Sequence, residues 1–299
     1  MNTRHHRLKG ARVLIAAGVL ALAAAGSSTL GADAPTRHSI YDHGRIHVCL
    51  RGCRFNRIQK AVNAARSGDT IEIGHGTYFE NVTISGKNLT VAGASAELTT
   101  IDGRSLGPVI SLEGTTVTLK GLTIVHGSGV NGGGIAAGVA DLEVDDSVIA
   151  SNVATQTGGG IDVLDGSLTL TGSVVTRNNA PSGGGIHLWA EIPATIDTSA
   201  LVSNEADIGA GIYIEYASRT TITRSTVSNN VSSGTAGGIW ISGGDAREAP
   251  SPYVVVNQSA VVENTAQTSG GIDNTTCPVF RTCLSLTGGS VVALNSPGP

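Results

Sequence analysis

The sequence predicts an all-β chain: a right-handed parallel β-helix solenoid with a short N-terminal capping helix. Three observations support this class. Two motifs recur with nearly the same period, each period contains short alternating apolar segments, and the composition is unusual. Glycine provides 41 of the 299 residues without a collagen period. Aromatic residues make up only 3%, so the predicted core is narrow and lined by Val, Ile, Leu and Ala.

The N-terminus resembles an export signal. Basic residues within 4–12 precede an uncharged run, Val13 to Ala25, which is too short to span a bilayer as a helix. We expect a signal peptide over residues 1–34, cut after Ala25 or near Ala34, and a secreted, extracellular protein. The alternative is a short anchor that is never cut. No later stretch is apolar for long enough to cross a membrane.

The charge balance excludes some classes of partner. Removing the signal would take away four basic residues and one acidic residue, which moves the net charge from −4 to −7. No basic stripe remains, so we expect neither nucleic acid nor an anionic membrane as a partner.

Four cysteines in an exported chain suggest two disulfides. They lie as Cys49 and Cys53 near the start and as Cys277 and Cys283 near the end. Local pairing would hold each end of the fold, but three connectivities are open, and four free thiols are the alternative.

The repeat is the strongest signal in the sequence. A Gly-Gly-Gly-Ile motif or a close variant ends at six isoleucines: Ile135, Ile161, Ile186, Ile212, Ile239 and Ile272. A serine followed five residues later by asparagine marks the same coils, and the asparagines are Asn152, Asn178, Asn204, Asn230, Asn264 and Asn295. Both markers keep a period of about 26 residues, the length of one β-helix coil, and both lengthen between the same two coils. We assign these asparagines a structural role, with each amide bonding to the asparagine and backbone of adjacent coils.

Each period contains three short strands: one before the serine, one after it, and one that begins at the Gly-Ile step. Leu168–Leu170, Val174–Val175 and Ile161 show this pattern in one coil. A single coil cannot bury its own apolar residues, but coils stacked about 4.8 Å apart share hydrogen bonds and a continuous interior. We expect the glycine run to allow a positive φ where the chain turns onto the next sheet.

The region upstream of the repeats has a different pattern. Residues 55–65 place Phe55, Ile58, Ala61 and Val62 on one helical face. A solenoid has an open apolar end that must be covered, so we expect this helix to lie across the N-terminal end. The predicted domains are 35–105, the cap and first coils, and 106–299, the repeat region. Its C-terminal cover is thinner: the Cys277–Cys283 segment, a last strand and a Pro-rich tail.

The stretch FNRIQKAVNAARSGDTIEIGHGTYFENVTISGKNLTVAGASAELTTIDG resembles the N-terminal cap of bacterial right-handed β-helix proteins of the pectate-lyase-like kind. The later coils, such as SNVATQTGGGI and RNNAPSGGGI, are similar to the repeats of chlamydial polymorphic membrane proteins. Together these resemblances cover nearly all of the mature chain. They imply a β-helix fold, but the catalytic motifs of the β-helix esterases are missing here. Of the polygalacturonase motifs only Gly74-His75-Gly76 is present, in the capping segment and away from any acidic cluster, so no activity is carried over.

One face of the predicted solenoid differs from the rest. If the isoleucine after each glycine run points inward, the residues one and three places later point outward. The first row is Ala136, Asp162, His187, Tyr213, Trp240 and Asp273; the second is Gly138, Leu164, Trp189, Glu215, Ser242 and Thr275. Both tryptophans of the chain fall on this face, and an insertion at about Gly243 to Pro252 follows one of them.

A flat face of Trp189, Trp240 and Tyr213 with Asp273 nearby could bind a polysaccharide, because aromatic planes cover sugar rings and carboxylates accept hydroxyl hydrogen bonds. The alternative is that these aromatics only stabilise cross-strand ladders, and that the acids form a solvent-facing polar ladder.

The same face offers candidate catalytic residues: Asp162, His187, Tyr213 and Glu215. An aspartate beside a histidine could orient it as a general base, with tyrosine as acid. Asp162 and Glu215 could instead form a carboxylate pair, but stacking places them about 12 Å apart. This exceeds even the inverting-glycosidase range of about 6.5–9.5 Å.

No cofactor is expected. Asp141, Glu143 and Asp145 alternate along one strand face, but calcium needs six to eight oxygen ligands, so a calcium site is not supported.

Three functions therefore remain. The first is a non-catalytic secreted or cell-surface protein that recognises a polysaccharide or surface partner on the aromatic and acidic face. The second is a polysaccharide lyase or glycoside hydrolase acting on the same face, and the third is a passive structural rod.

Overall fold

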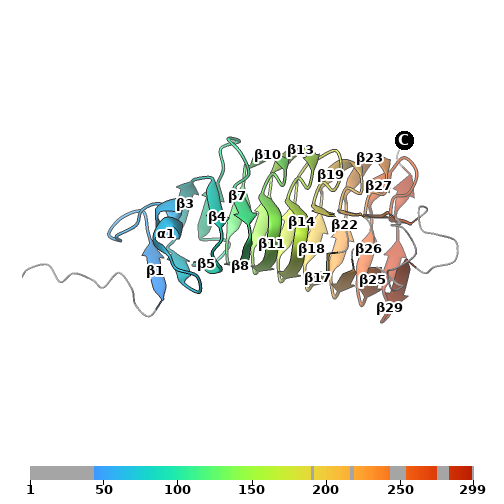
Figure 1. Cartoon of the computed structure of the whole chain (residues 1–299). Coiled ribbons are helices and arrows are strands. Elements are labelled where there is room, and N and C mark those ends of the chain that lie inside the picture. Colours follow the sequence, from blue (N-terminus) through green and yellow to red (C-terminus); the bar gives the residue numbers. More distant parts are fainter. Residues whose placement is uncertain (1–43, 190–191, 216–218, 243–253, 275–282, 298–299) are drawn as a thin grey trace, which may run out of the picture. The chain divides into compact units, whose positions relative to one another are not determined.

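The chain folds as a parallel β-solenoid, seen in a computed structural model that describes residues 44–189, 192–215, 219–242, 254–274 and 283–297. The described residues all lie in one compact unit, Ser39–Pro299. The predicted signal peptide and the insertion at Gly243 to Pro252 fall outside them. The strands lie side by side in chain order along the stack (Figure 1), and every strand pair is parallel.

Sheet A has 16 strands and forms the broadest side of the solenoid. Its strands are β1 (Arg45–Val48), β2 (Thr70–Ile73), β4 (Val82–Ser85), β5 (Leu89–Gly93), β7 (Ile110–Glu113), β8 (Thr115–Lys120), β11 (Ile135–Asp145), β14 (Ile161–Thr171), β16 (Ile186–Leu188), β17 (Ala194–Asp197), β20 (Ile212–Ile214), β21 (Thr220–Thr223), β24 (Ile239–Ile241), β25 (Val254–Asn257), β28 (Ile272–Asp273) and β29 (Leu284–Thr287).

Sheet B has nine strands. They are β3 (Gly76–Phe79), β6 (Thr99–Asp102), β9 (Thr123–Val125), β12 (Val148–Ala150), β15 (Val174–Thr176), β18 (Ala200–Val202), β22 (Thr226–Ser228), β26 (Ala260–Val262) and β30 (Val291–Ala293).

The third side, sheet C, consists of a pair, β10 (Ser128–Asn131) and β13 (Val153–Thr157), and a group of four. The four are β19 (Glu205–Ile208), β23 (Val231–Thr235), β27 (Thr265–Ala266) and β31 (Ser296–Pro297). Isolated bridges through Asn179 connect the two groups.

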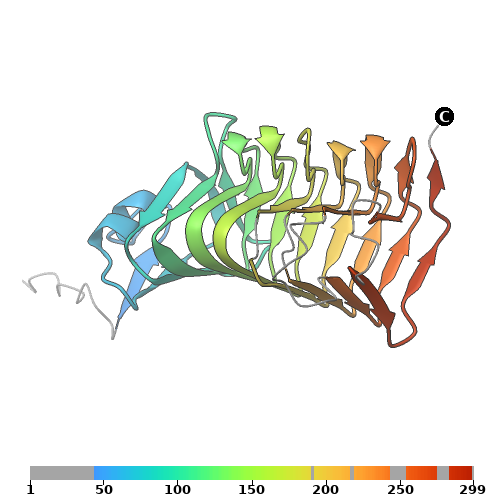
Figure 2. The ribbon, with the colours of Figure 1, turned by 45° about the vertical axis from the view of Figure 1, so that its right-hand side comes forward.

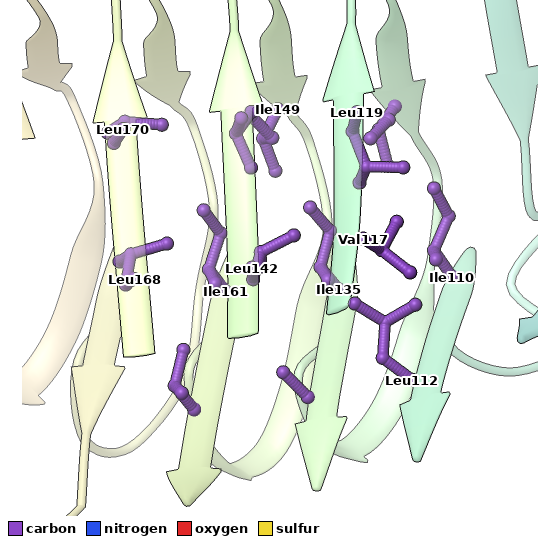
Figure 3. Packing of buried hydrophobic residues seen from close by; sticks show 14 of the residues in the cluster. Ile110, Leu112, Val117, Leu119, Ile135, Leu142, Ile149, Ile161, Leu168 and Leu170 are labelled. Atoms are coloured by element: carbon purple, nitrogen blue, oxygen red, sulfur yellow. The ribbon is translucent and has the colours of Figure 1, made fainter. Parts of the chain in front are cut away.

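The register confirms the repeat seen in the sequence. The isoleucines of the Gly-Ile steps pair with one another from Ile135 to Ile272. Because their side chains point inward, each lies on the isoleucine of the next coil and all are buried except the last, which is partly buried. Alternate residues of the other strands fill the same interior, and Figure 3 shows this packing around Ile135, Ile161 and Leu168.

Sheet A changes character along the solenoid. Strands β11 and β14 run unbroken through a bend (Figure 2), whereas in later coils the same stretch is split into two strands, as in β16 and β17. The connections are residues 189–193, 215–219, 242–253 and 274–283. All four begin within two residues after the row that begins with Ala136, so the breaks in sheet A lie beside the predicted face.

Two ladders of buried polar side chains hold the corners. At the corner between sheets B and C, the Asn178 amide donates to the Ile149 carbonyl (3.0 Å) and to Asn204 Oδ1 (3.1 Å), and its Oδ1 accepts from the Asn152 backbone and side chain (3.0 Å each). The same pattern repeats to Asn295. At the corner between sheets A and B, each serine hydroxyl from Ser173 onward accepts from the backbone N–H of the serine one coil earlier, as Ser199 does from Ser173 (3.1 Å). We refer to the asparagine series as the asparagine ladder.

The glycine run has two physical roles: one glycine takes a positive φ, and another lets adjacent coils approach closely. Gly158 takes a φ of +63°, as expected for a turn onto sheet A. Gly160 does not, but a Cβ on it would lie 2.6 Å from the carbonyl oxygen of Gly185 in the next coil. The last glycine is therefore needed because adjacent coils approach each other closely at this corner.

The N-terminal end is covered by α1 (Ile58–Ala64), which buries Ile58, Ala61 and Val62 against the first coil. The buried Glu80 accepts from the backbone N–H groups of Ile58 (2.8 Å) and Gln59 (3.1 Å), where a carboxylate complements the helix dipole. Cys49 and Cys53 form a disulfide beside this cap. Cys283 is also disulfide-bonded, and Cys277 lies outside the described residues.

Candidate functional site

The outer face of sheet A carries the first of the two aperiodic rows of side chains that the sequence singled out. Asp162, His187, Tyr213, Trp240 and Asp273 pair with one another from strand to strand, beginning at Ala136. We call this row the outer stack. Its members come from β11, β14, β16, β20, β24 and β28, so that each coil contributes one residue.

A second row lies two residues further along each coil. The backbone register continues past the strands, because Trp189 N–H donates to the Val163 carbonyl (3.0 Å) and Glu215 N–H to the Leu188 carbonyl (2.9 Å). Trp189 and Glu215 are thus neighbours in adjacent coils, next to Leu164 and Ser242. The remaining member, Thr275, is outside the described residues.

The two rows meet at His187. Its Nδ1 lies 2.7 Å from Asp162 Oδ1, and its Nε2 lies 3.1 Å from Glu215 Oε2. The Thr157 hydroxyl also donates to Asp162 Oδ1 at 2.7 Å. His187 is therefore held between two carboxylates from the neighbouring coils on either side.

The charge state of His187 follows from these contacts. Burial alone lowers its pKa, because the imidazolium loses its hydration. The hydrogen bonds to Asp162 and Glu215 and the two negative charges outweigh this effect, so the pKa of His187 is raised above its ordinary value of 6.5. The cluster thus favours a protonated imidazolium between two carboxylates.

Outward orientation does not mean exposure for the first two polar members. Asp162 and His187 are 4% and 2% exposed, so the solvent-facing polar ladder considered as an alternative is wrong for them. The corner before each strand folds back against the outer face of sheet A. A Cβ on Gly158 would lie 2.6 Å from the Asp162 Cβ. The corner, together with the neighbouring side chains, covers residues that alternation alone would place in water.

The aromatic members do not form the flat platform that the sequence predicted. Tyr213 and Trp240 stack with their ring centroids 4.4 Å apart and an interplanar angle of 3°, and His187 stacks on Tyr213 at 5.1 Å. Strands in parallel register place equivalent side chains one above another, so the rings cover each other's faces. Both faces of Tyr213 are occupied, by His187 on one side and Trp240 on the other.

Trp189 differs from the stacked rings. It meets His187 edge-on, with the ring centroids 6.0 Å apart and an angle of 64°, and it remains 38% exposed. Of the four residues proposed for ligand binding, it is the one with the most accessible ring. Asp273 is buried, which corrects its expected place on an open surface.

The carboxylate pair also differs from the expectation. Asp162 and Glu215 bind the two nitrogens of one imidazole, so only the His187 ring lies between the two carboxyl groups. The distance between these groups is therefore shorter than the distance expected for residues two coils apart. The reason is that the Glu215 side chain extends back across one coil. The space between these carboxylates is filled by His187, and both of its nitrogens are engaged.

Sequence reasoning brought Asp162, His187, Tyr213 and Glu215 to one face but missed two features. Thr157 belongs to sheet C, and only the corner geometry brings its hydroxyl to Asp162. The contact between Glu215 and His187 is diagonal, between the two rows, and no spacing rule within one row could reveal it.

No metal site emerges from the described part of the chain, where no three or more His, Cys, Asp or Glu side chains are placed to hold an ion. Asp141 accepts from the Ser167 hydroxyl (2.7 Å) and Glu143 from the Thr118 hydroxyl (2.9 Å). The pKa of Asp145 is raised, first by burial and second by the negative charge of Glu143. The positive charge of Lys120 lowers it, but by less than these two effects raise it. Within the same residues, no helix is long and apolar enough to cross a membrane.

Comparison with known proteins bears on the fold. The family model described as "Right handed beta helix region" matches residues 108–277. A rice weevil pectin methyl esterase structure is 15% identical, with a TM-score of 0.41, over 82% of this chain and 88% of that one. A pectin methylesterase from Aspergillus niger, in deglycosylated form, is 10% identical with a TM-score of 0.41, over 85% and 87%. No curated protein matches the chain.

Proposed function

The chain belongs to the right-handed β-helix family, and from this premise we propose that it is an exported, non-catalytic protein that binds a polysaccharide or a surface glycan on the outer face of sheet A. The observation that carries the proposal is the contrast between His187 and Trp189. The first is buried with both nitrogens hydrogen-bonded, and the second presents an indole to solvent directly beside it.

The contacts of His187 argue against catalysis by this cluster. A general base needs a free nitrogen within reach of the substrate, and His187 has neither a free nitrogen nor access to solvent. A glycosidic bond would have to lie between the two carboxylates of a glycosidase, and here an imidazole occupies that place. The cluster instead forms a rigid base beside Trp189 and holds the Glu215 carboxylate in place.

Trp189 and Glu215 have the chemistry of a sugar-binding pair. An exposed indole packs on the apolar face of a pyranose ring, and a carboxylate accepts hydrogen bonds from its hydroxyls. The Glu215 side chain is 14% exposed, and its backbone lies one coil from Trp189. Two of the chain segments that interrupt sheet A begin at these same positions, and such connecting segments often carry binding residues.

The test is binding of the purified protein to a panel of acidic and neutral polysaccharides, compared with the Trp189→Ala variant. Val231→Ala is the matched control, because Val231 is an exposed apolar residue on sheet C. We expect at least one polysaccharide to bind, with a roughly tenfold loss in Trp189→Ala and none in Val231→Ala. Absence of binding across the panel, or equal loss in both variants, would refute the proposal.

Each polysaccharide is also examined afterwards for shortened chains. If chains are shortened by the unaltered protein, the lyase or hydrolase hypothesis replaces the binding hypothesis. His187→Gln would then show whether the cluster takes part in cleavage. If His187 is only structural, its substitution lowers stability without changing the pH profile of cleavage.

A further inference from the structure

The N-terminal cap is a basic end on an acidic solenoid. Residues 44–66 contain six Lys or Arg and no Asp or Glu, whereas residues 67–299 contain eight Lys or Arg and 21 Asp or Glu. The net charge of −4 for the whole chain hides this contrast. The six cations belong to β1, to α1 and to the segments on either side of α1, at the N-terminal end of the stack (Figure 1). All six are exposed: Arg45, Arg51, Arg54, Arg57, Lys60 and Arg66.

Four of these cations follow one another at every third residue: Arg51, Arg54, Arg57 and Lys60. Three residues of even a fully extended chain span only about 10–11 Å. The Debye length at physiological ionic strength is about 8 Å, so the fields of successive cations overlap. We call these four residues the basic cap, which offers an anionic partner several positive charges within one short segment.

The first half of the basic cap lies in a cross-linked loop. The Cys49–Cys53 disulfide joins two Cα atoms 5.4 Å apart, and Cys49 N–H donates to the Phe55 carbonyl (3.0 Å). The Arg54 guanidinium lies over the Phe55 ring, 5.4 Å from its centroid. A loop that is already ordered loses little conformational freedom when it binds. The loop therefore presents Arg51 and Arg54 in a preformed arrangement.

Most of the basic cap has no carboxylate partner. In the part of the chain that the structure describes, Arg51, Arg54 and Lys60 make no ion pair. Arg57 lies 3.7 Å from a carboxylate oxygen of Glu80, but its own side chain is 59% exposed. A guanidinium has five N–H donors and binds a carboxylate through two of them at once. The basic cap thus keeps donors and positive charge for an external anion.

We infer that the basic cap binds an acidic polysaccharide, whose carboxylates lie along one chain and can meet successive cations. The acidic coils repel the same polymer, which restricts it to this end. The inference goes beyond the proposed function, because the two sites are separate. Trp189 follows β16, and β2, β5, β8, β11 and β14 lie between β1 and β16 in sheet A.

An anionic membrane fits this surface less well. A helix that lies on a membrane inserts an apolar face among the lipids. Helix α1 buries Ile58, Ala61 and Val62 against the first coil, and its exposed residues include Lys60 and Asn63. The cap therefore offers a membrane positive charge but no apolar helix face to insert.

The experiment titrates the purified protein with polygalacturonate at about 50 mM and about 300 mM salt. We expect the polymer to bind at the lower salt concentration and its affinity to fall at least about tenfold at the higher one, because exposed charges are screened. Absence of binding at the lower salt concentration, or an affinity that salt does not change, would overturn the inference.

Two double variants with the same change of charge locate the site. Arg51→Gln/Lys60→Gln removes two cations of the basic cap, and we expect the dissociation constant for polygalacturonate to rise at least about tenfold. Lys120→Gln/Arg177→Gln removes two exposed cations of the repeat region and should change it less than about twofold. All four side chains are exposed, so both variants should fold, which circular dichroism verifies. Equal losses of affinity would contradict a site at the cap.

Trp189→Ala separates this inference from the proposed function. Polygalacturonate bound at the basic cap keeps its affinity in Trp189→Ala. A loss there, without a loss in Arg51→Gln/Lys60→Gln, would place the polymer on the outer face of sheet A, which overturns the inference and leaves the proposed function standing. Vesicles of phosphatidylglycerol and phosphatidylcholine are the last comparison. If they bind the protein more tightly than polygalacturonate does, the basic cap is a membrane surface and the inference is wrong.

Discussion

The asparagine ladder and the outer stack each contain one residue from every coil, yet the first repeats a single residue type and the second does not. The ladder repeats one residue type, and each amide satisfies the next by the same set of hydrogen bonds. In the outer stack almost every coil contributes a different residue, and each contact is made once, as between His187 and Asp162. A periodic row serves every coil equally and is explained by the fold. An aperiodic row is not needed for the repeat, so its residues point to a local role.

The ladder should respond most strongly to mutation. Asn178→Ala removes the buried side chain that bonds to the Ile149 carbonyl, to Asn204 Oδ1 and to both the backbone N–H and the side-chain amide of Asn152. We expect a loss of about 5 kcal/mol in the free energy of unfolding, because four buried hydrogen bonds are lost and a buried group left unsatisfied costs about 1–3 kcal/mol. Asn179→Ala, next in the chain but exposed, should change stability by less than about 0.5 kcal/mol. Denaturant unfolding of both variants measures the difference, and equal losses would contradict a structural ladder.

The outer stack should be nearly as sensitive at its buried centre. His187→Leu removes the cation between Asp162 and Glu215, and breaking such a buried pair costs about 3–5 kcal/mol. His126→Leu is the matched control, since His126 Nδ1 lies 3.0 Å from Asp102 Oδ2 but its side chain is mostly exposed. An exposed pair contributes only about 0–1 kcal/mol. Similar losses in the two variants would mean that burial does not set the strength of the His187 cluster.

Stability should also depend on pH through His187 but not through the ladder, which has no titrating group. The pKa of His187 is raised in the folded chain, so its protonation contributes stability that is fully present below the unfolded value of about 6.5. That contribution is lost as pH rises through the folded pKa. Thermal unfolding midpoints should therefore fall from pH 6 towards pH 9, and the fall should be smaller in His187→Leu. An unchanged slope in the variant would assign it to other groups.

The smallest expected effect concerns the stacked rings. Tyr213→Phe keeps a ring between His187 and Trp240, whereas Tyr213→Leu removes it. We expect Tyr213→Leu to be less stable than Tyr213→Phe by about 1 kcal/mol, the contribution of an aromatic pair beyond its buried area. If the two variants unfold at the same denaturant concentration, the rings only fill space.

Export, the signal peptide and the likeness of the later repeats to polymorphic membrane proteins stay predictions. So do the domain limits at residues 35–105 and 106–299. Functional roles are likewise predictions for seven residues of the outer face: Asp162, His187, Tyr213, Glu215, Trp189, Trp240 and Asp273.

The sequence by itself determined the β-helix and its register, because a solenoid uses the same position in every coil for the same purpose. The spacing from Ile135 to Ile272 and from Asn152 to Asn295 therefore predicted which residues pair along the stack. It also predicted that Asp162, His187 and Tyr213 are neighbours in successive coils.

Only the tertiary structure decided what those neighbours do. The corner between sheets C and A brings Thr157 and Gly158 against Asp162, and the side chain of Glu215 reaches back one coil to His187. Both depend on corner angles and side-chain rotamers, which the repeat period does not specify. The same holds for the stacked faces of Tyr213 and Trp240. Alternation tells which side of a strand a residue occupies, and the packing of the whole solenoid decides whether that side meets water.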